Sequence, residues 1–342
     1  IEGLGTAENP SIGLNLTEDQ QERLGKKVDE LFQEADNSRQ TWRNKIRSDL
    51  KLYYGQKEEV NFPFKNAANI HVPLVRIIKE TLQANLVGSF DFTKPIRVMP
   101  VGPEDKDKVS KIQKYLNWQF VNEIPWFDLV DKSVDGALLY GRIPLKVRYL
   151  QETQLNPETQ KLELLFDGVK VDILLPESIL TPPDSMDADV DKMEYIMHEF
   201  QISQSDLRRR QKSGLYKNVE MSLKKFGETR IDKDNIDLVR DIRVGIDKYT
   251  QKTGKPTLLE VYLYYDINDD GIDENVVVTL LKETKTVLRA DYWVLPRPFV
   301  LVIFSSVDGK ADGESFIDLL EEINRELNTL HNQRVDAVTL TN

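Results

Sequence analysis

The sequence contains no cysteine and only three histidines among its 342 residues. Without thiols the chain cannot form disulfides or thiolate metal sites. His71, His198 and His331 stand far apart in the sequence, which disfavours a histidine-based metal site or catalytic triad. There is also no GxxxxGK[ST], GxSxG or HExxH motif and no Rossmann glycine fingerprint. These absences favour a protein that is not an enzyme, and the residues indicate no cofactor.

Long apolar runs and an excess of basic charge are missing as well. No apolar run reaches the roughly 18 residues of a membrane span, and no signal peptide opens the sequence, so we expect no membrane partner. The formal net charge of −11 excludes broad nucleic-acid binding through a basic surface. It is compatible with a protein that lets DNA pass without holding it, because like charges repel. The first residue is Ile, so we expect the natural N-terminus to lie further upstream.

Helical periodicity dominates the first 141 residues. Thr17 is a predicted N-cap, and the apolar spacing after it continues to Gly55. This pattern is typical of one helix or of two helices with a break near residues 36–38. A further helix is predicted to start at Pro73, and residues 104–141 predict two helices separated by Pro125.

Alternating apolar and polar residues predict the strands. Residues 143–153 and 162–175 are expected to pair around the polar turn QLNPETQ, and residues 192–202 predict another strand. The segment KPIRVMPVG, residues 94–102, is predicted to be a short strand. Alternation over residues 258–293, with a turn at Asp-Asp-Gly, predicts a β-rich region.

The end of the sequence predicts one long amphipathic helix starting at Gly313. Its apolar stripe consists of Phe316, Leu319, Leu320, Ile323, Leu327, Leu330 and Val335. We expect this stripe to be packed and the opposite, polar face to be wet. Upstream, Ser203 or Ser205 is a predicted helix cap. The charge-dense, sparsely apolar stretch over residues 223–256 is typical of a mobile connection or of a solvent-exposed helix, and we favour a helix over part of 232–249.

The segment from Asp266 to Glu274 has two interpretations. Asp266, Asn268, Asp270 and Gly271 match the first half of a calcium-binding loop, but Val277 occupies the position of the bidentate Glu. The alternative is a hairpin turn in which Asp and Asn side chains cap their own backbone and Gly adopts positive φ. The flanking strand patterns favour the turn.

Five segments, in order over residues 42–338, resemble the portal proteins of tailed bacteriophages. They are FPFKNAANIHVPLVRIIKETLQANL from Phe62, ALLYGRIPLKV from Ala137, LPESILTPPDSMD from Leu175, EVYLYYDINDDG from Glu260, and DGESFIDLLEEINRELNTLHNQRVDAV from Asp312. The resemblance implies an α+β fold with an α/β wing, stem helices and a small β-rich clip.

This resemblance divides the chain into five parts. They are a loose segment over 1–17, a wing-like body over 18–202, a charged connection with a possible first stem helix over 203–257, a clip-like region over 258–312, and a stem or channel helix over 313–342. Portal chains usually continue past this helix into a crown, whereas the sequence given ends at Asn342. We expect either that a longer chain contains the crown or that this protein has none.

The resemblance also implies a function. A portal protein forms a homo-oligomeric ring, usually a dodecamer, at one capsid vertex of the virion, after assembly in the host cytoplasm. Double-stranded DNA passes through it during packaging and ejection, and it contacts the large terminase, a tail adaptor, and the major capsid or scaffolding protein. The expected channel residues are Asn328, Asn332 and Arg334, and the expected interface residues are Trp42, Phe62, Phe64, Ile70 and Leu74. The alternatives are another connector or minor head protein of the virion, and a calcium-stabilised binding module.

Overall fold

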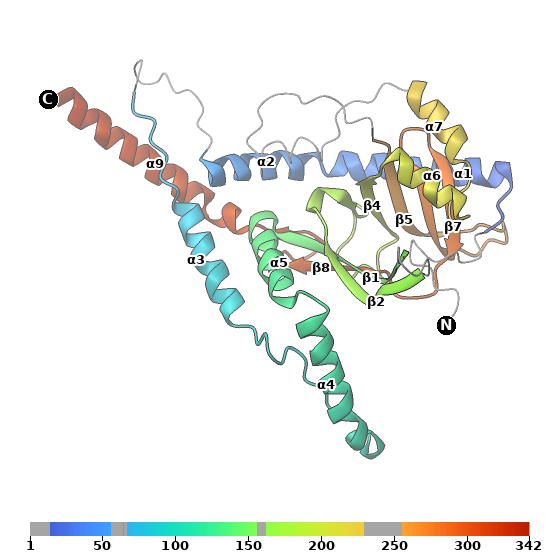
Figure 1. The fold of residues 1–342 in the computed structure, drawn as a ribbon. Helices are drawn as coiled ribbons and strands as arrows, with labels where there is room; N and C mark the ends of the chain where they lie inside the picture. The colour runs from blue at the N-terminus through green and yellow to red at the C-terminus, as the bar shows by residue number, and fades with distance from the viewer. Residues whose placement is uncertain (1–13, 56–63, 65–66, 156–161, 229–254, 342) are drawn as a thin grey trace.

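The computed structural model describes residues 14–55, 64, 67–155, 162–228 and 255–341 (Figure 1). Two antiparallel β-sheets and the helix α1 form a body, and two long helices, α4 and α9, extend away from it (Figure 1). Within the described ranges, no helix is long and apolar enough to cross a membrane. Phe62 and the helix predicted over part of 232–249 lie outside the described residues.

The N-terminal helical region consists of two helices, α1 (Glu18–Ser38) and α2 (Gln40–Tyr54). Thr17 caps α1 in a capping box with Gln20, as its side-chain oxygen accepts from the Gln20 N–H at 3.3 Å. The break falls at Arg39, one residue beyond the predicted position, and α2 ends before Gly55. The prediction of a capped helical region with a break is therefore confirmed.

The larger sheet has five antiparallel strands in the order β3-β4-β5-β6-β7. They are β3 (Ile179–Leu180), β4 (Tyr195–Gln201), β5 (Thr257–Tyr265), β6 (Glu274–Leu281) and β7 (Thr286–Tyr292). Before β3, residues Pro176–Ser178 form a short 3₁₀ turn. The pairing of β4 with β5 joins the expected ranges 18–202 and 258–312 in one sheet. These two ranges therefore share a core rather than forming separate ones.

Strand alternation gives this sheet two apolar faces. Leu259, Val261 and Leu263 of β5 are buried against α1, whose Leu24 and Val28 are fully buried in the same cluster. Side chains of the opposite parity, beginning with Leu258, pack against the helices α6 (Gln204–Lys212) and α7 (Val219–Glu228). Ser203 caps α6, which confirms one of the two predicted caps.

The smaller sheet covers the rest of that second face. Its order is β2-β1-β8, with β1 (Arg142–Leu155), β2 (Leu162–Ile173) and β8 (Phe299–Ile303). The ring of Phe299 lies 5.5 Å from that of Tyr262, in an edge-to-face contact between the sheets. Beside it, Lys146 of β1 forms an ion pair with the buried Glu260 of β5. The two sheets are thus joined by both apolar and ionic contacts.

The carboxylate of Glu260 is a buried charge with several partners. Burial alone would raise the pKa of Glu260, but the ammonium of Lys146, together with His198, holds that pKa well below its usual range. The Tyr262 hydroxyl also donates to Glu260, at 2.7 Å. Such a carboxylate stabilises the fold only while its partners remain in place.

The helix α3 (Leu74–Gly88) begins immediately after Pro73, as predicted. The pair α4 (Lys106–Asn122) and α5 (Trp126–Tyr140) flanks Pro125, also as predicted, and the 3₁₀ turn Pro103–Asp105 precedes α4. Lys79 of α3 is 1% exposed and pairs with Asp135 of α5. Burial lowers the pKa of Lys79 to about 8.

The strand predicted over residues 94–102 is wrong. Pro95 and Pro100 interrupt the N–H groups that a ladder needs, and no strand pairs with this segment among the described residues. Instead, the N–H groups of Ile96 and Val98 donate to side chains of α4, namely Asn117 at 2.9 Å and Gln113 at 3.1 Å.

The predicted start of the last helix is also corrected. Gly313–Glu314 is the strand β10, paired with β9 (Ser305–Ser306), and the helix α9 runs from Phe316 to Thr341. Ser315 precedes it, and its hydroxyl accepts from the Asp318 N–H at 3.0 Å. Gly141 lies against Gly313, where a Cβ on Gly141 would come within 2.3 Å of the Gly313 carbonyl oxygen. Both glycines belong to segments that carry the resemblance, and their close approach brings α5 to the base of α9.

The interpretation of the Asp266–Glu274 segment as a hairpin turn is confirmed. The carboxylate of Asp266 accepts from the N–H groups of Asp270 at 3.1 Å and Gly271 at 2.7 Å. Gly271 adopts φ +86°, a conformation that favours glycine. The carboxylate oxygens that a calcium loop would use thus bond the turn's own backbone.

Candidate assembly surface

The face of α9 that contacts the rest of the chain is polar. Its side chains recur every four residues and bind an extended segment, residues 68–72, which we call the strap. The three bonds run from the Ala68 N–H to Asp336 at 2.7 Å, from the Ile70 N–H to Asn332 at 2.8 Å, and from the Val72 N–H to Asn328 at 2.9 Å. Asn332 also donates to the Ile70 carbonyl at 3.2 Å. The strap thereby obtains from a helix the bonds that a strand would obtain from a neighbour.

Helix and strand dimensions explain this match. Four residues of an α-helix rise about 6 Å. Two residues of an extended chain span about 6.6 Å. Every second N–H of the strap therefore meets every fourth side chain of an antiparallel helix. Asn, Gln and Asp suit this position, because each offers a carbonyl or carboxylate oxygen at a short reach.

The consequence for α9 is that its apolar stripe faces outward. Leu319 is 49% exposed, Ile323 57% and Leu330 57%. An amphipathic helix of a single chain normally turns this stripe toward the core. Only the base of α9 follows that rule, since Ile317 is fully buried in a cluster with residues of α2 and α5. The expectation of a wet polar face is therefore wrong, because that face binds the strap. Beyond the first turn of α9 the apolar stripe is not covered by its own chain, and its packing in an assembled ring stays a prediction.

The expected channel residues, Asn328, Asn332 and Arg334, all lie on α9. Asn328 and Asn332 lie against the strap, and their side-chain oxygens are used by its backbone. These two asparagines hold the strap within the chain, and their contact with DNA stays a prediction. Arg334 is exposed and lies outside this row of side chains.

The helix α4 also binds an extended segment through polar side chains spaced four residues apart. Asn117 and Gln113, four residues apart, bind the backbone of Ile96 and Val98, and Asn117 also donates to the Ile96 carbonyl at 3.0 Å. None of the residues of α4 is buried. Its outward face carries an apolar ridge in which Ile112, Tyr115, Trp118 and Val121 recur every three residues, and each is about half exposed. We call α4 and α9 the arms.

The two arms leave the body in different directions (Figure 1). The C-terminal end of α9 lies at one extremity of the molecule, and α4 projects on the side of the sheets opposite α1 (Figure 1). Exposed apolar surfaces of this extent on a chain without membrane-spanning helices among its described residues mark sites of contact with other proteins. The arms are therefore the candidate assembly surface.

The expected interface residues have diverse positions. Trp42 is half-buried beside a core cluster, and the guanidinium of Arg39 lies 4.2 Å above its ring, so it packs within its own chain. Phe64 and Leu74 are half-buried, while Ile70 is 40% exposed on the strap. Their role in an interface stays a prediction, and the residues of the two arms were missed.

A signal for the arms was present in the sequence. The polar residues Asn324, Asn328, Asn332 and Asp336 recur every four positions along α9. Because side chains four apart share one helix face, this row competes with the apolar stripe for the side facing the chain. The sequence alone did not show which of the two faces of α9 contacts the chain. The partner of the polar side chains is the backbone of the strap, which has no side-chain pattern that the sequence could reveal.

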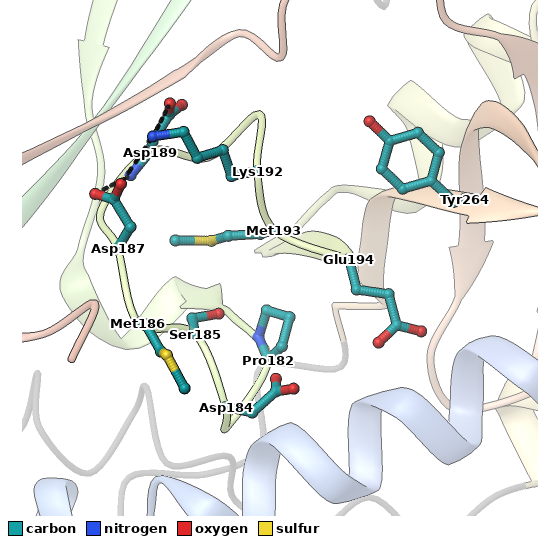
Figure 2. A pocket seen from close by; sticks show the side chains of 10 residues that line it. All are labelled: Pro182, Asp184, Ser185, Met186, Asp187, Asp189, Lys192, Met193, Glu194 and Tyr264. Carbon is teal, nitrogen blue, oxygen red and sulfur yellow. Dashed lines mark hydrogen bonds and ion pairs between the residues drawn. The ribbon is translucent and has the colours of Figure 1, made fainter. Parts of the chain in front are cut away.

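A separate surface hollow of about 510 Å³ lies beside the loop between β3 and β4 (Figure 2). Its lining includes the carboxylates of Asp184, Asp187, Asp189 and Glu194 and one cation, Lys192. Lys192 lies 2.9 Å from Asp187 and 3.2 Å from Asp189 (Figure 2). Its hydrogen bond with Asp187 helps to lower the pKa of that carboxyl. An acidic hollow of this kind repels phosphate, so it is unsuited to gripping DNA.

Comparison with protein families gives one match. The family model described as phage SU10 portal protein matches residues 24–164 and 158–342, which together extend over most of the sequence. No curated protein matches the chain.

Proposed function

The chain belongs to the phage SU10 portal protein family, and on that premise we propose that copies of it assemble into a ring at one vertex of the capsid. Portal proteins of tailed phages are structural components of the virion. The ring, a dodecamer in this proposal, is the conduit for double-stranded DNA during packaging and ejection. It is also the surface on which a large terminase, a tail adaptor, and the capsid or scaffolding protein dock.

The observation that carries the proposal is the outward apolar face of the arms. A closed ring needs two different, complementary surfaces on each copy, because its contacts run head to tail. The chain presents two such surfaces, the α9 stripe around Ile323 and the α4 ridge around Trp118. The two helices that carry these surfaces extend from the body in different directions (Figure 1).

The charge of the chain supports the role of a conduit. A net charge of −11 and an acidic surface hollow disfavour a grip on phosphates, so DNA can slide. Arg334, exposed on α9, is the residue that we propose to face the channel. The sequence contains no P-loop, which supports a separate ATPase as the motor.

We also propose which helices and strands make up the stem, the wing and the clip. The α9 helix is a stem or channel helix, with a first stem helix within 203–257. The smaller sheet, with α1, α2, β3 and β4, belongs to the wing, and the hairpin region of β5, β6 and β7 is the clip or the β part next to it. The sharing of one sheet by β4 and β5 supports a clip that is continuous with the wing.

The test is the mass of the purified chain by sedimentation, with negative-stain microscopy of the same sample. A ring with a central hole supports the proposal. A chain that remains monomeric at every concentration tested, including in a longer form with additional flanking sequence, contradicts it.

A further inference from the structure

Three carboxylates meet where α2 passes the base of α9. Asp49 comes from α2, and Asp318 and Glu321 come from the first two turns of α9. Each offers one oxygen, and these oxygens lie within 4.8 Å of one another. Asp49 is 0% exposed, and its other neighbour is the Ser315 hydroxyl at 3.4 Å. The cluster lies outside the arms' apolar surfaces and has no role in the proposed ring contacts.

A second observation comes from Asn324, the first member of the polar row on α9. Unlike the asparagines that hold the strap, Asn324 is 1% exposed, and neither its Oδ1 nor its Nδ2 has a hydrogen-bond partner among the described residues. Asn324 follows Glu321 by three residues on α9, so the two side chains lie on the same face of the helix, one turn apart. A buried amide without partners is costly. Its carbonyl oxygen is therefore a candidate fourth ligand.

The protein's own cations leave part of the cluster unsatisfied. Lys45 lies 2.9 Å from Asp318 Oδ2, and Arg325 lies 2.5 Å from Glu321 Oε1. The Oδ1 atoms of Asp49 and Asp318 are buried and have no partner within the described chain. Burial and the neighbouring Asp318 raise the pKa of Asp49 to about 8, which reflects the cost of a negative charge at this place.

We propose that Asp49, Asp318, Glu321 and Asn324 bind a hard divalent cation, Ca²⁺ or Mg²⁺, that fastens α2 to the base of α9. Carboxylate and amide oxygens are the ligands that these ions prefer, and water completes their coordination. A cation there neutralises the buried Asp49 and satisfies the amide oxygen of Asn324. The site fixes the angle at which the α9 arm leaves the body. It requires only one chain, so it stands independently of the ring.

The experiment measures the melting temperature of the purified chain after treatment with EDTA, and again with CaCl₂ or MgCl₂ in separate series. At a hundredfold excess over Kd, we expect a rise of roughly 3–8 °C with at least one ion. Titration calorimetry of the same samples should give one ion per chain. The rise should be lost in Asp318→Asn and in Glu321→Gln, each of which preserves size while removing charge.

Three further variants keep the proposal falsifiable. Asp49→Asn mimics a protonated carboxyl, so it should fold and still lose the response to the ion. Glu322→Gln, a neighbouring exposed residue, and Asp270→Asn, in the β5–β6 hairpin, should retain the response in full. The proposal is overturned if the untreated chain and its EDTA-treated form respond to neither ion, or if Asp318→Asn, Glu321→Gln and Asp49→Asn respond normally. A response lost only in Asp270→Asn places the ion at the hairpin and also overturns it.

Discussion

The body and the arms of this protein follow opposite rules for the same kinds of residue. In the body, strand alternation turns apolar side chains such as Val261 and Leu259 into a closed core beneath α1. In the arms, polar side chains face the chain and apolar ones face outward. The difference teaches that the inward face of an amphipathic helix depends on what lies beside it. An extended backbone segment with unpaired N–H groups selects the polar face.

The same comparison separates two requirements of a portal subunit. The body has to be stable as a single chain, and its ion pair between the sheets is buried with several partners. The arms have to be held to their own chain before assembly and still leave an apolar surface free for a neighbouring copy. Binding the arms to their own chain through polar side chains meets both needs.

The largest effect on the body should come from Lys146→Met. This change leaves the Glu260 carboxylate buried without its ammonium partner, which costs about 3–5 kcal/mol of unfolding free energy. The matched control is Arg148→Met, two residues further along β1, whose ion pair with Asp172 is about one-third exposed. It should cost about 1 kcal/mol or less. Urea denaturation of both variants measures their unfolding free energies. An equal loss of unfolding free energy in the two variants would contradict the role of burial.

Acid should reduce the difference in unfolding free energy between the natural chain and Lys146→Met. The pKa of Glu260 is held below that of the unfolded chain, so its contribution is present above about pH 4.5 and is lost as the pH falls below it. In the variant this contribution is missing at every pH. Unfolding curves at pH 7 and in steps below pH 4.5 test the effect. A constant difference across this window would show that the ion pair does not stabilise the body.

In the arms, Asn332→Leu should release the middle of the strap. The Ile70 N–H and carbonyl lose their partner, at a cost of about 1 kcal/mol, because the site is partly open to water. Amide exchange at Ile70 should accelerate about fivefold, while amides of β5 keep their protection. Gln333→Leu, on the exposed face one position further, is the control. Unchanged exchange at Ile70 in the variant would refute the strap contact.

An effect of similar size is expected at the hairpin turn between β5 and β6. Gly271 has φ +86°, and a Cβ there would meet no atom within 4 Å. Gly271→Ala should therefore cost only the conformational strain, about 1–2 kcal/mol. Ile272→Ala, in the same turn and 70% exposed, should change the unfolding free energy by less than about 0.5 kcal/mol. A loss well above 2 kcal/mol at Gly271 would mean that the turn has a further role.

The sequence predicted the elements of the body well, for physical reasons. Thr17, Pro73 and Pro125 are local signals, and strand alternation over residues 258–293 reports burial directly. It failed at residues 94–102 and on the face of α9 for one shared reason. In both places side chains of a helix bind the backbone of an extended segment. A pattern of apolar residues contains no information about that contact.

The candidate site could be predicted only in part. The family was evident from five ordered segments, and the family match confirms it. Trp42, an expected interface residue, packs beside the core, and its role in an interface stays a prediction. Ile323 and Trp118 emerged as exposed only from the structure. Separating a core helix from an interface helix requires knowing which face the remainder of the chain covers.

The central claim is that the outward face of α9 packs on a neighbouring copy. The most direct test compares the mass of the natural chain with that of the double variant Ile323→Asp, Leu330→Asp, beside Gln333→Asp as a control of equal chemistry on an exposed polar position. The account predicts that the double variant is monomeric and that the control forms rings. Because the changed residues are exposed in the single chain, the melting temperatures of the unassembled double variant and the unassembled natural chain should agree within about 2 °C. Rings of undiminished yield from the double variant would contradict it.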